Sequence, residues 1–438
     1  MRLVHKLTTW LSGAADPDTF PYSEVVTELH RTGRHFADKE LLALLDQTRT
    51  YLTTSPYPDA TEPGGESAPV RLLRSFLDVA LDKWDGRYDY HSYLALGLLG
   101  IPGADPGGDG AAADPERARR QGDRILLQLI ADALAFEMAA EAGTTGLLPQ
   151  QRPAPVVVAK RYRLGVRAAA PPLSRLGLSV PLDEGNPAAT AALLNAVVAA
   201  DQSAEERRNL GLSMLPVYLL HDEYLFIRVL QAYECTFALL AVELQATIDA
   251  LAAGLAQPAA DCLAHAEERL RHAAPLFSLM ASMQPQSFRT FRIYTEGASA
   301  IQSRSYKLME SLCRTPTESR LASAAYRSVP GIRSQVLAGQ PTVDQAYRSA
   351  AHAGRLTQPQ QHLLEQRMRG FAAAVMQWRQ THYRLATRML GTGQPGTGYT
   401  EGTPYLAAAR SIPVFTAVTR DADSTRPTDT EMEASPSE

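Results

Sequence analysis

The sequence has little cysteine, no strong charge of one sign and no long apolar run. Its three cysteines, Cys235, Cys262 and Cys313, are too few and too scattered for a disulfide framework or a zinc site. Forty-three basic and 47 acidic residues leave a net charge of −4, so a nucleic-acid partner is not expected. No stretch of about 18 uninterrupted apolar residues appears, and the first residues lack the apolar core of a secretory signal. These absences predict a cytoplasmic protein without a membrane span.

What the sequence does contain is a helical period. Hydrophobic residues make up 45% of its 438 residues, which is ample for a large core. The best stripe repeats at spacings of three and four residues and indicates one long helix: Phe226, Val229, Tyr233, Phe237, Leu240 and Leu244. Strand signals are sparse, and residues 156–164, VVVAKRYRL, are the best candidate for an extended segment. We therefore expect an all-α protein of roughly eight to twelve helices. The other expected helices are 69–82, 120–142, 188–202, 258–283, 300–313, 343–353 and 358–391.

Three segments rich in Pro, Gly, Ser and acidic residues are expected to be flexible: 54–69, 100–115 and the tail 419–438, for which disorder is predicted. Residues 205–418 form the compact part that carries the motifs. Residues 1–204 are expected to be a helical N-terminal region that packs against it, since residues 76–99 are too apolar and aromatic for a linker.

One histidine lies on a helical pattern near the C-terminus. Trp378, His382, Leu385 and Met389 follow at i, i+4, i+7 and i+11, which puts His382 on the buried face of a helix. It is either a core histidine satisfied by hydrogen bonds or an axial ligand of haem iron, because a porphyrin supplies the other four nitrogens. Zinc would need further ligands, and no HxxH or CxxC spacing supplies them.

A glycine-rich loop follows this helix. Residues 391–396, GTGQPG, match GxGxxG, but they close a helix where a dinucleotide loop opens one, so Gly391 is better interpreted as a helix terminator. The next unit, Gly396-Thr397-Gly398, is either a surface turn or a place where backbone approaches a ligand and a hydroxyl meets an ammonium group.

Four motifs in order, spanning about residues 85–410, resemble the tryptophan 2,3-dioxygenases and their relatives, the histidine-ligated haem-dependent aromatic oxygenases. They are YHSYLAL (90–96), HDEYLFIRVLQAYE (221–234), FRTFRIYTEGASAIQSRSYKLME (288–310) and WRQTHYRLATRMLG (378–391) followed by GTGYTEGTPYL. The resemblance implies the helical haem-binding fold of that family. It also implies an enzyme, a haem b cofactor and a homo-oligomer, either a dimer or a tetramer.

Carried over by position, the resemblance assigns His382 as the proximal iron ligand and Arg292 as the partner of the substrate carboxylate. Thr397, between Gly396 and Gly398, would receive the substrate ammonium group. Phe226, Ser299, Tyr90 and Tyr93 would line the substrate pocket, with Ser299 near the haem edge. Plainer alternatives stay open for three of them: Arg292 as a helix-end ion pair, Phe226 as core, and Ser299 as a helix cap.

The sequence departs from the family at Leu230, where tryptophan dioxygenases carry a distal histidine. We expect His91 to supply the distal polar group instead, the alternative being a solvent-facing histidine. The runs SAIQSRSYK (299–307) and DGRYDYHSYLAL (85–96) are most similar to the haem-dependent tyrosine hydroxylases of actinobacterial antibiotic pathways.

The expected activity is therefore ring hydroxylation of L-tyrosine or a substituted tyrosine, with peroxide or dioxygen, in specialised metabolism. The alternatives are a tryptophan 2,3-dioxygenase, an indole monooxygenase, or a helical scaffold without chemistry.

Overall fold

The computed structural model describes residues 2–13, 15–54, 67–86, 89–103, 114–181, 185–393 and 402–418. Within these ranges the regular structure is helical, apart from one parallel β-bridge between Gln150 and Leu220. The prediction of an all-α fold is confirmed. The described residues form twenty α-helical segments, more than the eight to twelve expected, because several are single turns of four residues. The tail from residue 419 and most of 54–69 and 100–115 lie outside the described residues.

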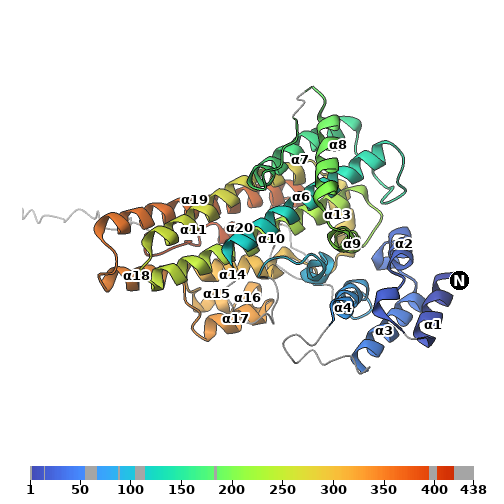
Figure 1. Ribbon diagram of the computed structural model, residues 1–438, viewed down its shortest axis with the longest axis horizontal. Coiled ribbons are helices and arrows are strands. Elements are labelled where there is room, and N and C mark those ends of the chain that lie inside the picture. Colours follow the sequence, from blue (N-terminus) through green and yellow to red (C-terminus); the bar gives the residue numbers. More distant parts are fainter. Residues whose placement is uncertain are drawn as a thin grey trace, which may run out of the picture.

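Helix α10, His221–Ala252, forms the centre of the molecule (Figure 1). It contains neither Gly nor Pro for 32 residues, and it ends just before Gly254, whose φ of +75° suits a helix terminus. Helices α6, α11 and α14 pack directly against it, and α19 packs on α11. Their bounds are α6 Pro115–Glu141, α11 Ala256–His272, α14 Arg304–Cys313 and α19 Gln358–Leu390.

The packing between α6 and α10 depends on a glycine. A Cβ atom at Gly122 of α6 would lie only 2.4 Å from Cδ1 of Leu239 on α10. Helix α10 is also the one described helix that is long and apolar enough to cross a membrane, but 83% of its apolar window is buried inside the protein. We therefore interpret it as the core helix of the bundle.

The segment 156–164, expected to be extended, is helical, and that prediction is wrong. It lies in α7, Pro155–Arg175, which begins with a proline in its first turn. Val158, Arg161, Tyr162 and Gly165 recur at helical spacing and are buried, so packing overrides the strand preference of the three valines. Proline also divides the expected helix 258–283 into α11 and α12, Ala274–Met280, because Pro275 cannot donate its backbone nitrogen.

The N-terminal helices have a core of their own, made chiefly of residues from Leu7 to Leu98. They are joined to the bundle by backbone hydrogen bonds, from Arg34 N to Pro216 O (2.9 Å) and from His35 N to Val217 O (3.1 Å). The main core, in contrast, contains residues from Tyr90 to Val418 and includes α6, α7 and α8. The main core therefore includes residues on both sides of residue 204, and residues 34 and 35 connect the N-terminal helices to the bundle.

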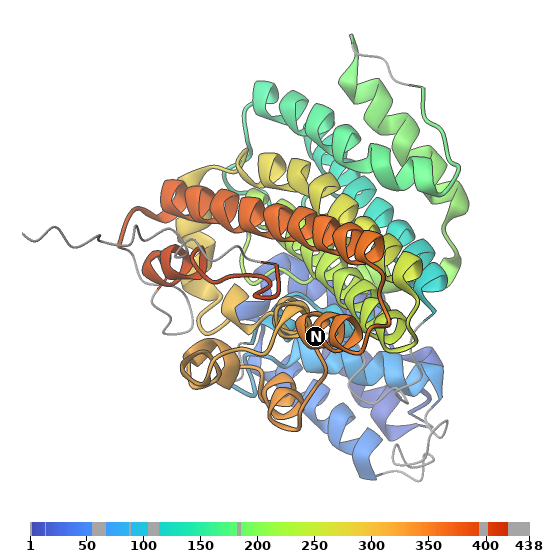
Figure 2. The same cartoon turned by 90° about the vertical axis from the view of Figure 1, so that its left-hand side faces the viewer.

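Figure 2 shows the N-terminal helices and the α7–α8 pair on opposite sides of the bundle. The remaining α-helices are α1 Arg2–Ser12, α2 Tyr22–Thr32, α3 Lys39–Thr54, α4 Ala68–Ala80, α5 Tyr90–Tyr93, α8 Pro187–Asp201, α9 Ala204–Leu212, α13 Pro285–Tyr294, α15 Glu318–Leu321, α16 Ala324–Arg327, α17 Pro330–Leu337, α18 Val343–His352 and α20 Thr403–Ala409. The 3-10 turns are η1 Pro17–Thr19, η2 Arg34–Phe36, η3 Leu96–Leu98 and η4 Ala300–Gln302.

Candidate functional site

One cavity of about 250 Å³ lies between α10, α13, α14, α19 and α20, with α5 contributing to its wall. Most of its lining is apolar or aromatic, and a few polar and charged side chains interrupt that lining. Such a composition is typical of a site that binds a largely apolar ligand and fixes it through a few polar contacts.

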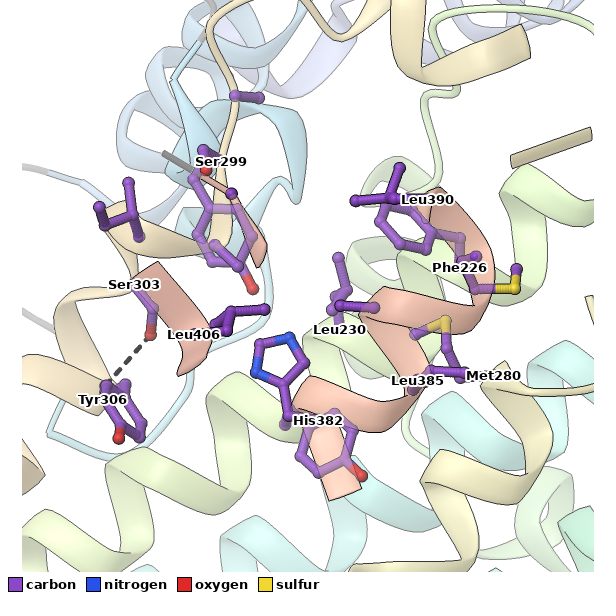
Figure 3. Close-up of a pocket in the computed structure, with 18 of the residues that line it drawn as sticks. Phe226, Leu230, Met280, Ser299, Ser303, Tyr306, His382, Leu385, Leu390 and Leu406 are labelled. Atoms are coloured by element: carbon purple, nitrogen blue, oxygen red, sulfur yellow. Dashed lines mark hydrogen bonds between the residues drawn. The ribbon is translucent and has the colours of Figure 1, made fainter. Parts of the chain in front are cut away.

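His382 reaches this cavity from α19, as do Trp378, Leu385 and Met389. The prediction that these four residues share one face of a helix is confirmed. Figure 3 shows the imidazole ring projecting into the space between Leu230 and Leu406. The helix ends at Leu390, and Gly391 takes a φ of +102°, which agrees with its interpretation as a helix terminator.

The environment of His382 keeps its imidazole neutral. Its ring lies 5.0 Å from that of Trp378 and 6.2 Å from that of Phe277, measured between centroids. Burial lowers the pKa of His382 to about 4. Within the described residues no hydrogen bond or ion pair to this ring is present, and no group of three or more His, Cys, Asp or Glu side chains is arranged to hold a metal ion. A neutral, unpartnered imidazole facing a cavity is the state in which histidine binds a metal centre.

A cationic cluster forms another part of the wall. Lys307 is 1% exposed, lines the cavity and donates to the hydroxyl of Tyr405 at 3.3 Å. Arg379 also lines the cavity, and Arg320 lies behind them; both pair with the carboxylate of Glu310, at 3.5 and 3.0 Å. Three cations thus lie near two buried carboxylates, because the charge of Lys307 acts on both Glu310 and Glu234. This buried positive excess would be balanced by an anionic ligand in the cavity.

Together these features fit haem. His382 could hold the iron through a neutral nitrogen, the apolar walls suit a porphyrin, and Lys307 and Arg379 would supply positive charge for its two propionates. Burial lowers the pKa of Lys307, and the charge of Glu310 opposes that shift.

Arg292 and Phe226 form the end of the cavity nearest α13. The ring of Phe226 lies 5.5 Å from that of Phe288 and 5.2 Å from that of Phe291, the residue before Arg292. Arg292 lines the cavity, and burial lowers its pKa. An arginine beside a cluster of aromatic rings can orient an aromatic ligand that carries a carboxylate.

Tyr90 and Glu234 form a polar corner in the same cavity. Glu234 is 1% exposed, and the hydroxyls of Tyr90, Ser303 and Ser305 lie beside its carboxylate. Burial raises the pKa of Glu234 to about 6. The backbone of Tyr90 is fixed by Gln302, whose Oε1 accepts from Tyr90 N and from Ser299 N, both at 3.0 Å.

The structure brings most of the expected site residues together. His382, Arg292, Phe226, Ser299, Tyr90 and Tyr93 all line the cavity, and so does Leu230. Tyr93 donates to Glu223, although the distance of 3.4 Å is long. Ser299 opens the η4 turn, where its side chain takes part in a capping box with Gln302, so the plainer interpretation also holds for it. Gly396, Thr397 and Gly398 lie outside the described residues.

His91 is not brought to the cavity. Tyr90 and Tyr93 share the buried face of the short helix α5, whereas the residue after Tyr90 points about 100° away from it. His91 is exposed, and it does not line the cavity. The geometry therefore does not support a distal role for His91; the residues of this helix that line the cavity are Tyr90 and Tyr93.

Sequence reasoning missed four polar residues of the site: Glu234, Gln302, Lys307 and Arg379. All four lie inside the motifs at 221–234, 288–310 and 378–391. A signal was available for Glu234, whose charge interrupts an otherwise apolar helical face, whereas Lys307 has Ser303, Glu310 and Ser311 at helical spacing and looks solvated in the sequence. Only the structure places both side chains on the wall of one cavity.

Comparison with known proteins finds one family across the central part of the chain. A family model described as tryptophan 2,3-dioxygenase matches residues 212–366, which contain Leu230, Glu234 and Arg292. The tryptophan 2,3-dioxygenase of Paraburkholderia phytofirmans is 26% identical over 228 residues, covering 44% of this chain and 74% of that protein. Those of an Anaeromyxobacter strain and of Erythrobacter litoralis are both 27% identical, covering 44% of this chain and 84% and 85% of those proteins.

Proposed function

This chain belongs to the tryptophan 2,3-dioxygenase superfamily, and from that premise we propose that it oxygenates the ring of free L-tryptophan or a tryptophan derivative. It is a haem-dependent oxidoreductase with an all-α fold. The observation that carries the proposal is the neutral imidazole of His382 in a cavity that also contains Arg292.

His382 would hold the iron, while Lys307 and Arg379 would face the propionates. When bound, haem supplies the iron at which dioxygen or peroxide is activated. The protein contributes the rest: a cavity that excludes water, and side chains that fix the substrate in a reactive pose.

Arg292 orients the substrate in this proposal. A guanidinium group can hold a carboxylate by two parallel hydrogen bonds, which fixes both position and direction. Phe226 and Phe291 then offer aromatic edges and faces to the substrate ring, so that the ring points away from Arg292 into the cavity. Thr397 is proposed to receive the ammonium group.

The comparisons favour tryptophan over the tyrosine substrate expected from the sequence, because the relatives are named tryptophan 2,3-dioxygenases. Hydroxylation of tyrosine is the second candidate, and one observation supports it. Leu230 lines the cavity at the position where tryptophan dioxygenases carry a histidine, so the base usual for that reaction is missing there.

The proposal is tested by loading the purified full chain with haem and offering L-tryptophan, L-tyrosine and 3-methyl-L-tyrosine. Each is supplied with peroxide and, separately, with dioxygen and a reductant. A gain of two oxygen atoms on tryptophan supports dioxygenation, and a gain of one on tryptophan supports monooxygenation of the indole. A gain of one oxygen on a tyrosine alone supports the second candidate. If the chain binds no haem, the oxygenase proposal fails.

A further inference from the structure

Glu234 differs from the other buried glutamates of the bundle. Glu137 pairs with Arg161 at 2.6 Å, Glu243 with Arg119 at 2.6 Å, and Glu310 with Arg320 at 3.0 Å. Neither carboxylate oxygen of Glu234 accepts a hydrogen bond of normal geometry within the described residues. Its neighbours are three hydroxyls and Lys307, none of them an arginine that would occupy both oxygens. The two carboxylate oxygens on the cavity wall can therefore still accept a hydrogen bond from a ligand in the cavity.

Polar side chains from two other helices surround the carboxylate of Glu234. Tyr90 approaches from α5, Ser303 and Ser305 from the start of α14, and Lys307 from the next turn of α14. On α10 itself the neighbouring titratable group is the buried thiol of Cys235. Gln302 holds the backbone of Tyr90, so the hydroxyl beside Glu234 is positioned by the motif that also contains Ser299.

Glu234 lies along α10 where the ring of an aromatic substrate would end if its carboxylate were bound by Arg292. Phe226, Leu230 and Glu234 follow at i, i+4 and i+8 and all line the cavity. The backbone at Glu234 is about 12 Å along the axis from that at Phe226, which marks the Arg292 end. A substrate with its carboxylate on Arg292 therefore lies along Leu230 and directs the edge of its ring toward Glu234.

We propose that Glu234, assisted by the hydroxyl of Tyr90, accepts a hydrogen bond from the polar hydrogen of the substrate ring and thereby selects aromatic amino acids that carry one. The ring donor is the indole N–H or the phenol O–H. Glu234 is then a specificity-determining residue that contacts the substrate in place of the side chain missing at Leu230. This inference rests on the proposed function and names the ring chemistry that the same site recognises.

The expected pH dependence follows from the chemistry of the carboxyl group. Ionised Glu234 only accepts hydrogen bonds, whereas the protonated acid also donates and accepts more weakly. Since burial raises its pKa to about 6, affinity for a ring donor should increase as pH rises from 5 to 7. A substrate without a ring donor should show no such increase.

The test measures binding to the haem-loaded full chain through the change in its absorption spectrum. L-Tryptophan is compared with 1-methyl-L-tryptophan, and L-tyrosine with O-methyl-L-tyrosine. The variants are Glu234→Gln and Tyr90→Phe. Glu243→Gln is the matched control, because Glu243 is a buried glutamate on the same helix that does not line the cavity.

In the wild-type protein we expect the donor-bearing substrate to bind more tightly than its methylated analogue. Glu234→Gln should reduce that preference about 10- to 100-fold, as expected for losing a hydrogen bond to a charged group. It should also abolish the rise in affinity between pH 5 and 7. Tyr90→Phe should reduce the preference less, and Glu243→Gln should leave both the preference and the pH profile unchanged.

An unchanged preference and pH profile in Glu234→Gln would overturn the inference, and so would an equal loss in Glu243→Gln. Either result would leave the proposed function intact, provided that haem and an aromatic amino acid still bind. Absence of a haem spectrum, or of any response to aromatic amino acids in the wild-type protein, would overturn both. Variant and wild type are compared with the same pair of substrates. The effect of the added methyl group's bulk on affinity therefore cancels when the two preferences are compared.

Discussion

The carboxylate of Asp222 accepts a hydrogen bond from the backbone N–H of Gln284 at 2.7 Å, and this contact joins the start of α10 to the start of α13. Asp222 also pairs with Arg161 at 2.5 Å, and Arg161 pairs in turn with Glu137 at 2.6 Å. All three side chains are at most 1% exposed. Since Phe226 lies on α10 and Arg292 on α13, this buried network sets the distance between the two residues that frame one end of the cavity.

Replacing Asp222 by Ala should weaken substrate binding, although Asp222 does not itself line the cavity. The change leaves Arg161 with a single carboxylate and frees the start of α13, so we expect a loss of about 3–5 kcal/mol in the free energy of unfolding. Chemical denaturation measures that loss, and a substrate titration measures the affinity. Ser203→Ala, which removes the cap of the distant helix α9, is the control; it should cost about 1 kcal/mol and leave affinity unchanged. Equal affinity in both variants would refute a positioning role for Asp222.

His382→Ala should abolish the Soret band of a histidine-ligated haem while the chain stays folded. Its imidazole packs near the rings of Phe277 and Trp378 and makes no hydrogen bond to the described residues, so its removal breaks none. Added imidazole should restore part of the spectrum by filling the space. His272→Ala, at a surface histidine beside Glu268 and outside the cavity, should keep the wild-type spectrum. A wild-type spectrum in His382→Ala would exclude this residue as the ligand.

The low pKa of His382 also predicts how ligation responds to acid. An ordinary histidine is half protonated near pH 6.5, whereas this one remains neutral to about pH 4. In the protein without haem, a depressed pKa contributes stability that is present above pH 6.5 and is lost as pH falls toward 4. The iron should accordingly keep its histidine ligand from pH 8 down to about pH 5, as followed by absorption spectra. Loss of ligation with a midpoint between pH 6 and 7 would contradict this environment.

Features of the site that depend on residues close in the sequence could be predicted, whereas those that depend on residues distant in the sequence could not. The shared face of Trp378 and His382 follows from helical periodicity, which is local and visible in the sequence. The sequence could not place His91, because the four-residue helix α5 exposes one residue and buries its neighbour, and no long period reveals which. The prediction of an extended segment at 156–164 was wrong because its three valines favour a strand locally. Burial of Arg161 between two carboxylates that are distant in the sequence favours the helix α7 instead.

Lys307 was overlooked for a related reason. Its charge looks like a solvated position in the sequence, and only the fold places it beside Glu310, Tyr405 and the cavity. The motif match nevertheless identified the haem fold and six of the cavity residues. It did so because motif order constrains three-dimensional arrangement far more than any single segment does.

Lys307→Met should lower haem affinity by removing a charge that faces the propionates. Methionine has a similar length and no charge, so the variant separates electrostatics from packing. Affinity is measured by titrating haem, and in parallel its dimethyl ester, into the protein. We expect the preference for free haem over the ester to fall several-fold in Lys307→Met and to stay unchanged in Lys160→Met, an exposed lysine on α7. An unchanged preference in Lys307→Met would show that the propionates lie elsewhere.

Arg292→Ala should reduce affinity for the amino acid substrate about 10- to 100-fold while haem content is kept, because a charge-assisted hydrogen bond to the carboxylate is lost. Arg292→Lys should recover only part of the affinity, since an ammonium group cannot form two parallel bonds. Tryptamine, which lacks the carboxylate, identifies the contact: wild type should prefer tryptophan to tryptamine, and Arg292→Ala should lose that preference. Arg289→Ala, at an exposed arginine one turn earlier on α13, is the matched control and should keep it. If Arg292→Ala loses haem instead, Arg292 has a structural role; if it still prefers tryptophan, the carboxylate binds elsewhere.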